Sequence, residues 1–102
     1  MTTLADKALE FGGRVEPNGS ILVPARSLMQ FLEAAQSAAV SVHYIECLFV
    51  SDRGTRPSMM LSATSDEFTD HGGLVAFADD AAARAIVEAD ADNSTAFFEV
   101  GP

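Results

Sequence analysis

The polar segment at residues 65–73 gathers side chains that could do chemistry. Asp66, Glu67, Asp70 and His71 stand within six consecutive residues. Carboxylate oxygens and an imidazole nitrogen can ligate a divalent metal, and a histidine beside an aspartate can act as a general base. The spacing lacks the alternating aspartates, the glycine and the final glutamate of a calcium-binding loop. We therefore expect a solvated acidic loop here, ending in a Gly-Gly pair that would let it move as a lid or a docking loop.

A second polar set lies on a predicted strand at residues 42–50. Strand alternation puts His43 and Cys47 on one face, and Tyr44 and Glu46 on the other. Residues four apart in a strand are separated by about 13 Å, too far for His43 to activate the Cys47 thiol directly. A carboxylate in mid-strand must reach solvent, a cation or a pocket. The polar residues of an alternative small-molecule pocket would then be His43, Tyr44, Glu46 and His71.

The one basic spot of the sequence is Arg53-Gly54-Thr55-Arg56, in a polar loop between two predicted strands. Two arginines in one loop could hold a carboxylate or a phosphate, although solvated arginines of a hairpin are the simpler interpretation. The sequence has no phosphate-binding glycine loop and no CxxC, HExxH or GxSxG motif. We therefore expect no catalytic residues, no metal site and no cofactor, and the sequence favours a binding protein over an enzyme.

Negative charge is concentrated in the C-terminal half. The 102 residues include 15 Asp or Glu and 6 Lys or Arg, for a net charge of −9. Between residues 66 and 99, nine acidic side chains accompany a single basic one, Arg84. Because phosphate backbones attract clustered cations, this sign argues against direct binding of nucleic acid. Such a surface either keeps the protein in solution or steers a basic partner toward it.

Hydropathy patterning predicts the elements that carry these residues. A short helix follows Thr3, a hairpin is centred on Asn18-Gly19, and a helix spans residues 27–39. Residues 42–50 are apolar on both alternating faces, which predicts an interior strand covered on both sides, with residues 58–64 as its antiparallel neighbour. Further on we expect a short buried strand at 74–77, an alanine-rich helix at 80–90 and a last strand at 95–100.

This order of elements resembles the split β-α-β arrangement of ferredoxin-like folds, β-α-β-β-α-β, with an added N-terminal helix and hairpin. We therefore predict a single α+β domain over residues 1–102, an antiparallel sheet with helices on one face. No apolar run approaches the roughly 18 residues of a membrane span, and the N-terminus lacks the features of a signal peptide. With one cysteine there is no internal disulfide, and the cytoplasm is the expected compartment.

The charge suggests a first function, that of a small acidic inhibitor or binding protein. Immunity proteins, antitoxins and anti-CRISPR proteins have this size and sign of charge. A compact polyanion can occupy the cationic groove of a nuclease or of another nucleic-acid-binding complex. The residues expected to bind this basic partner are Asp66, Glu67, Asp70, Asp79, Asp80, Glu88, Asp90 and Asp92.

The fold suggests a second function from another class. A ferredoxin-like homodimer could enclose a small-molecule pocket, as an isomerase or a lyase does, with the sheet packed against a second copy. Neither function involves a membrane. A monomer in solution would argue against this second hypothesis.

Overall fold

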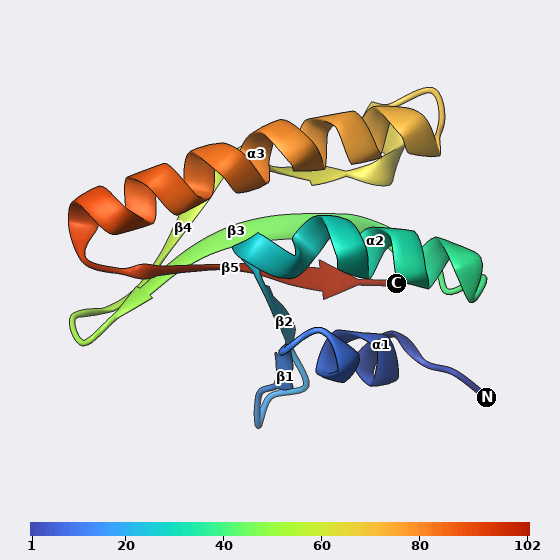
Figure 1. Ribbon diagram of the computed structural model, residues 1–102, viewed down its shortest axis with the longest axis horizontal. Coiled ribbons are helices and arrows are strands. Elements are labelled where there is room, and N and C mark those ends of the chain that lie inside the picture. The colour runs from blue at the N-terminus through green and yellow to red at the C-terminus, as the bar shows by residue number, and fades with distance from the viewer.

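The computed structural model describes all 102 residues. Its helices are α1 (Leu4–Glu10), α2 (Leu28–Ser37) and α3 (His71–Asp92), and its strands are β1 (Arg14–Val15), β2 (Ile21–Pro24), β3 (Tyr44–Ser51), β4 (Gly54–Thr64) and β5 (Thr95–Gly101) (Figure 1). Single 3₁₀ turns at Ala25–Ser27 and Ser65–Glu67 lead toward α2 and α3. None of the helices is both long enough and apolar enough to cross a bilayer.

The five strands form one antiparallel sheet in the order β1-β2-β5-β3-β4. The connection from β2 through α2 to β3 skips β5, which lies between those two strands. The connection from β4 through α3 to β5 likewise skips β3. The α+β class, the antiparallel sheet and the three helices are confirmed. The ferredoxin-like arrangement is not, since the strand order differs from the one that defines it. The last strand takes a central place, which suits a strand with buried side chains at Ala96, Phe98 and Val100.

One hydrophobic core lies between the sheet and its helices; Figure 1 shows α3 above β3 and β5, and α1 below them. Ile45, Cys47 and Phe49 of β3 point into it, and Phe98 of β5 is completely buried beside them. The helical side of the core combines the large side chains of α2 with a row of alanines on α3. Small side chains let α3 lie close to the sheet, so most of the apolar area of the central strands on this side is removed from water.

Two expectations for the strands are wrong. Residues 74–77 are helical, because Asp70 caps a helix that starts at His71, its side chain accepting from Gly73 N at 3.1 Å. Leu74 and Ala78, four residues apart, are both buried and so continue the helical stripe rather than forming a strand. The Gly-Gly pair belongs to the first turn of α3, not to a free loop, and a Cβ at Gly73 would meet the Phe68 side chain within 2.9–3.2 Å.

The second wrong expectation concerns the cover over β3. This strand is interior in the sheet, but its side chains are buried only at alternate positions. Leu48 and Val50 point to the other face, which we call the open face of the sheet, and are half-buried there. Phe97 lies opposite Leu48 on this face. The alternating apolar pattern therefore predicted correctly which side chains of β3 share a face. The prediction that both faces are covered is wrong, because only one of them is.

The edge strand β4 contains a wide bulge. Ile45 pairs with Ala63 while Cys47 pairs with Ser58, so residues 59–62 have no counterpart on β3. The bulge leaves Met59 and Met60 79% and 83% exposed. An irregular edge of this kind is a poor template for pairing with another strand.

Candidate functional site

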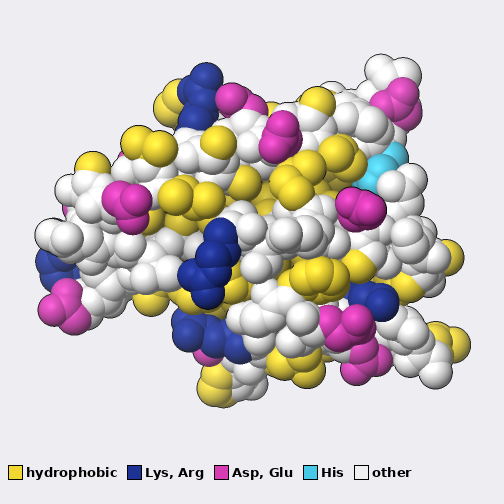
Figure 2. All heavy atoms as spheres, in the orientation of Figure 1, with side chains coloured by type: hydrophobic (Ala, Val, Ile, Leu, Met, Phe, Trp, Pro, Cys, Tyr) yellow, Lys and Arg dark blue, Asp and Glu magenta, His cyan; other side chains and the backbone are white.

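The side of α3 that points away from the core carries three exposed aspartates. We call it the outward face of α3, formed by Ala76, Asp79, Asp80, Ala83, Val87 and Asp90. Their spacing of three and four residues places them in one row along the helix, and all six are exposed. In Figure 2, hydrophobic and acidic side chains are mixed along the upper part of the molecule, where α3 lies, with a basic side chain beside them.

Two acidic residues of α3 predicted to bind the partner lie on another flank of the helix. Glu88 and Asp92, one turn apart, face the β3–β4 hairpin and pair with its arginines. Arg56 lies 3.6 Å from Glu88 and 3.5 Å from Asp92, and Arg53 lies 3.3 Å from Asp92. These two carboxylates hold the hairpin against the end of α3 and are partly neutralised there.

The three predicted acidic residues before α3 have local roles in capping. Asp70 is the N-cap of α3. Glu67 accepts from Thr64 N, and Asp66 accepts from the Thr64 hydroxyl. Their negative charge also suits the positive end of the α3 dipole. The eight predicted residues thus divide into the cap, the hairpin flank and the outward face of α3.

The ion pairs show which acidic side chains are neutralised by a basic partner and which are not. Five of the six basic side chains engage a carboxylate, and Arg26 is the exception. On the outward face of α3, Asp80 pairs with Arg84 at 2.9 Å, while Asp79 and Asp90 have no ion pair. Asp90 also lines a small hollow together with Arg26. The outward face of α3 therefore keeps a net negative charge.

The alternative pocket residues fall into two places. His43 and His71 line one hollow of about 560 Å³ beside the end of α2, and His43 Nδ1 lies 2.8 Å from Ser65 Oγ. Tyr44 and Glu46 point to the open face of the sheet, because strand alternation separates them from His43. The four side chains therefore do not surround one cavity.

Tyr44 is held on the open face by a polar contact. Its hydroxyl donates to Glu99 Oε2 at 2.8 Å. Burial and then the hydrogen bond to Glu99 raise the pKa of Tyr44 to about 12. At neutral pH the phenol is thus a fixed donor to that carboxylate, not a general base.

Cys47 has no features of a nucleophile. It is completely buried, and burial raises the pKa of its thiol to about 12, so the thiol stays protonated and inert at neutral pH. No group of three or more His, Cys, Asp or Glu side chains is placed to hold a metal ion.

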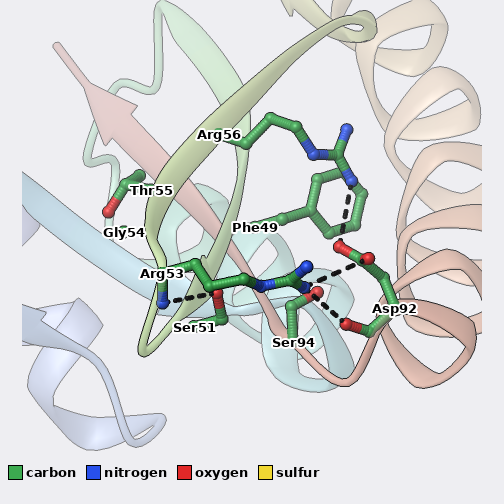
Figure 3. A pocket seen from close by; sticks show the side chains of 8 residues that line it. All are labelled: Phe49, Ser51, Arg53, Gly54, Thr55, Arg56, Asp92 and Ser94. Carbon is green, nitrogen blue, oxygen red and sulfur yellow. Dashed lines mark hydrogen bonds and ion pairs between the residues drawn. The ribbon is translucent and has the colours of Figure 1, made fainter.

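The hairpin arginines border a hollow of about 290 Å³ between β3, β4 and the end of α3 (Figure 3). Its lining combines Arg53 and Arg56 with Phe49, Asp92 and the hydroxyl side chains of Ser51 and Ser94, while the Thr55 side chain points to the other side of β4 (Figure 3). The sequence singled out the two arginines. It could not show Phe49, Asp92 or Ser94, which only the pairing of β3 with β4 and the end of α3 bring to them.

Comparisons with protein-family models, with curated proteins and with solved structures find no match to this chain. Charge, exposure and geometry are therefore the basis for inferring what the protein does.

Proposed function

We propose that this chain is a small non-enzymatic binding protein, of the immunity, antitoxin or anti-CRISPR kind, that docks the outward face of α3 on a basic protein. The observation that carries the proposal is the composition of this face. Val87 is 71% exposed, and it lies in one row with two exposed alanines and three aspartates. An apolar centre with a charged rim is how protein interfaces are commonly built.

The partner's chemistry follows from the charges that remain free. Asp79 and Asp90 have no ion pair, so a partner that brings Lys or Arg to them adds charge pairs without breaking any of the protein's own. The whole-chain charge of −9 has the same sign and attracts a cationic surface from a distance. A nuclease, or another nucleic-acid-binding complex, carries such a surface in its binding groove. The expected outcome is inhibition by occupation of that groove.

The proposal can be tested with two pairs of exposed carboxylates that form no ion pairs, one pair on the outward face of α3 and one pair elsewhere. Asp79→Lys with Asp90→Lys changes the outward face of α3, and Glu33→Lys with Asp52→Lys changes the net charge equally elsewhere. The partner is first captured from the cells that make the chain, and association rates are then measured by surface plasmon resonance. We expect the first pair to slow association at least about tenfold and the second much less, with a rate that falls as salt rises. Equal effects of the two pairs, or a captured partner that is acidic, would contradict the proposal.

The open face of the sheet supports a second candidate, a homodimer that binds a small molecule. Leu48, Val50 and Phe97 are half-buried there with no helix over them, and a second copy packed on the sheet would bury them. Light scattering tests this directly. A dimer that Leu48→Asp converts to a monomer supports it, and a wild-type monomer at high concentration contradicts it.

A further inference from the structure

The hollow beneath the β3–β4 hairpin contains a pair of arginines whose hydrogen-bonding capacity is mostly unused. A guanidinium has five N–H donors. Arg53 uses its Nη2 to donate to the Asp92 carbonyl at 3.0 Å and to Asp92 Oδ1 at 3.3 Å, and the Arg56 guanidinium makes no hydrogen bond within the protein. Its contacts with Glu88 and Asp92 are 3.6 and 3.5 Å long. Charge-assisted hydrogen bonds are normally about 2.7–2.9 Å, so these carboxylates do not saturate the arginines.

Arg56 is nonetheless held in place. Its guanidinium carbon lies 4.5 Å from the centre of the Phe49 ring, and Phe49 itself is buried. Stacking on an aromatic ring restricts a guanidinium while leaving the donors at its edge free. Figure 3 shows Arg56 extended above this ring, with Arg53 across the hollow. Two guanidiniums thus border the hollow, and that of Arg56 is already oriented.

A third group in the hollow lacks a partner. Ser94 Oγ is the one buried side-chain oxygen or nitrogen of the protein with no hydrogen-bond partner. In Figure 3 its hydroxyl points toward the side of the hollow that holds the Arg53 guanidinium. An unsatisfied buried hydroxyl costs free energy, which a ligand oxygen would recover. Because the oxygen is closed to water, a side chain at the rim must move before a ligand can reach it.

We propose that this hollow binds a phosphate group, free or as a monoester. A tetrahedral dianion offers many acceptor lone pairs to the two guanidiniums and to the hydroxyls of Ser51 and Ser94. Two guanidiniums face the carboxylates of Asp92 and Glu88, so the charges around the hollow balance, and a bound anion gains by taking up the donors that these long contacts leave unused. The charge of −9 opposes anions at long range, but physiological salt screens exposed charges beyond about 8 Å. The site lies on the flank of α3 that faces the hairpin and does not depend on the outward face of α3.

Amide NMR tests the site with inorganic phosphate and with O-phosphoserine, each titrated against sodium chloride at equal ionic strength. We expect saturable shifts at Gly54, Thr55 and Ser94. Arg56→Ala should weaken binding at least about tenfold, and Arg56→Lys, which keeps the charge but loses the fork, should weaken it less. The matched control is Arg84→Ala, because Arg84 is also an exposed arginine paired with a carboxylate. It should bind as the wild type does.

The two ligands identify the source of the phosphate. Tighter binding of O-phosphoserine indicates a monoester, and equal or tighter binding of inorganic phosphate indicates the free ion; both results support the site. Linear shifts that sodium chloride reproduces, or equal losses in the Arg56 and Arg84 variants, overturn it. If Arg56→Ala lowers stability but leaves the titration unchanged, the arginines are only a clamp between the hairpin and α3, and the proposal is wrong.

Discussion

The ring of Tyr44 occupies the space that a side chain at position 101 would need. Tyr44 and Gly101 face each other across β3 and β5. A Cβ on Gly101 would lie 1.9 Å from Tyr44 Cε1 and 2.4 Å from its Cζ. The ring thereby covers the end of β5, and its hydroxyl reaches Glu99 two residues before the glycine. An aromatic ring over a cross-strand glycine is a known device for stabilising a sheet at such a position.

Gly101→Ala should therefore destabilise the protein by about 1–3 kcal/mol, because the ring must move and its hydrogen bond to Glu99 is strained or lost. Chemical denaturation measures the change. The control is a double-mutant cycle with Tyr44→Ala. If the ring is the obstacle, the cost of Gly101→Ala falls sharply once the ring is absent. An equal cost in both backgrounds would mean that the backbone, and not Tyr44, excludes a side chain.

The same tyrosine predicts a pH dependence at high pH. Its pKa is raised to about 12, first by burial and then by Glu99, while the unfolded chain titrates near 10. The folded state thus keeps a proton that the unfolded state releases, so the unfolding free energy falls as pH rises from about 10 to 12. Tyr44 is the one tyrosine and there is no tryptophan, so phenolate absorbance reports it alone. Glu99→Gln should lower the measured pKa, and an unchanged pKa would leave burial and the nearby charge of Glu46 as its causes.

Two carboxylates on the open face of the sheet should repel each other. Glu46 and Glu99 lie directly opposite in the β3–β5 register. Like charges in this position are destabilising, so Glu46→Gln should stabilise the protein by about 0.2–1 kcal/mol, and by less at high salt. Glu33→Gln on α2 is the matched control, since Glu33 is exposed and has no ion pair. A loss of stability in Glu46→Gln would show that this carboxylate has a favourable partner.

The local elements could be predicted where a period or a cap is visible in the sequence. The helix expected at 27–39 is the turn Ala25–Ser27 followed by α2, and the strand expected at 42–50 is β3. Spacing of apolar residues and the Asn-Gly turn are local signals, and local signals suffice for elements of this kind. The start of α3 was missed because four apolar residues after a Gly-Gly pair have no period long enough to distinguish helix from strand.

Features that depend on contacts between residues far apart in the sequence could not be predicted. The insertion of β5 between β2 and β3 is decided by packing across the whole sheet. The same holds for the acidic residues: charge counting identified Glu88 and Asp92, but their pairing with Arg53 and Arg56 depends on where the hairpin lies against α3. Helical spacing alone does separate these two from the row of Asp79 and Asp90. The bulge in β4 also left no signal in the residues themselves.

The bulge in β4 depends on one hydroxyl, that of Ser62. Ser62 Oγ accepts from Cys47 N at 2.9 Å and donates to the Ser58 carbonyl at 2.6 Å. It therefore replaces the strand partners that residues 59–62 do not supply. Ser62→Ala leaves a backbone donor and an acceptor without their partner and should cost about 1–3 kcal/mol in the unfolding free energy.

Ser58→Ala is the matched control for this substitution, because Ser58 takes part through its backbone carbonyl and its own hydroxyl makes no hydrogen bond. It should change stability by less than about 0.5 kcal/mol. Hydrogen exchange should show faster exchange of the Cys47 amide in Ser62→Ala, since the amide loses its acceptor. If the two variants are equally stable and the Cys47 amide stays protected in both, water or a shifted strand satisfies it, and the hydroxyl does not hold the bulge.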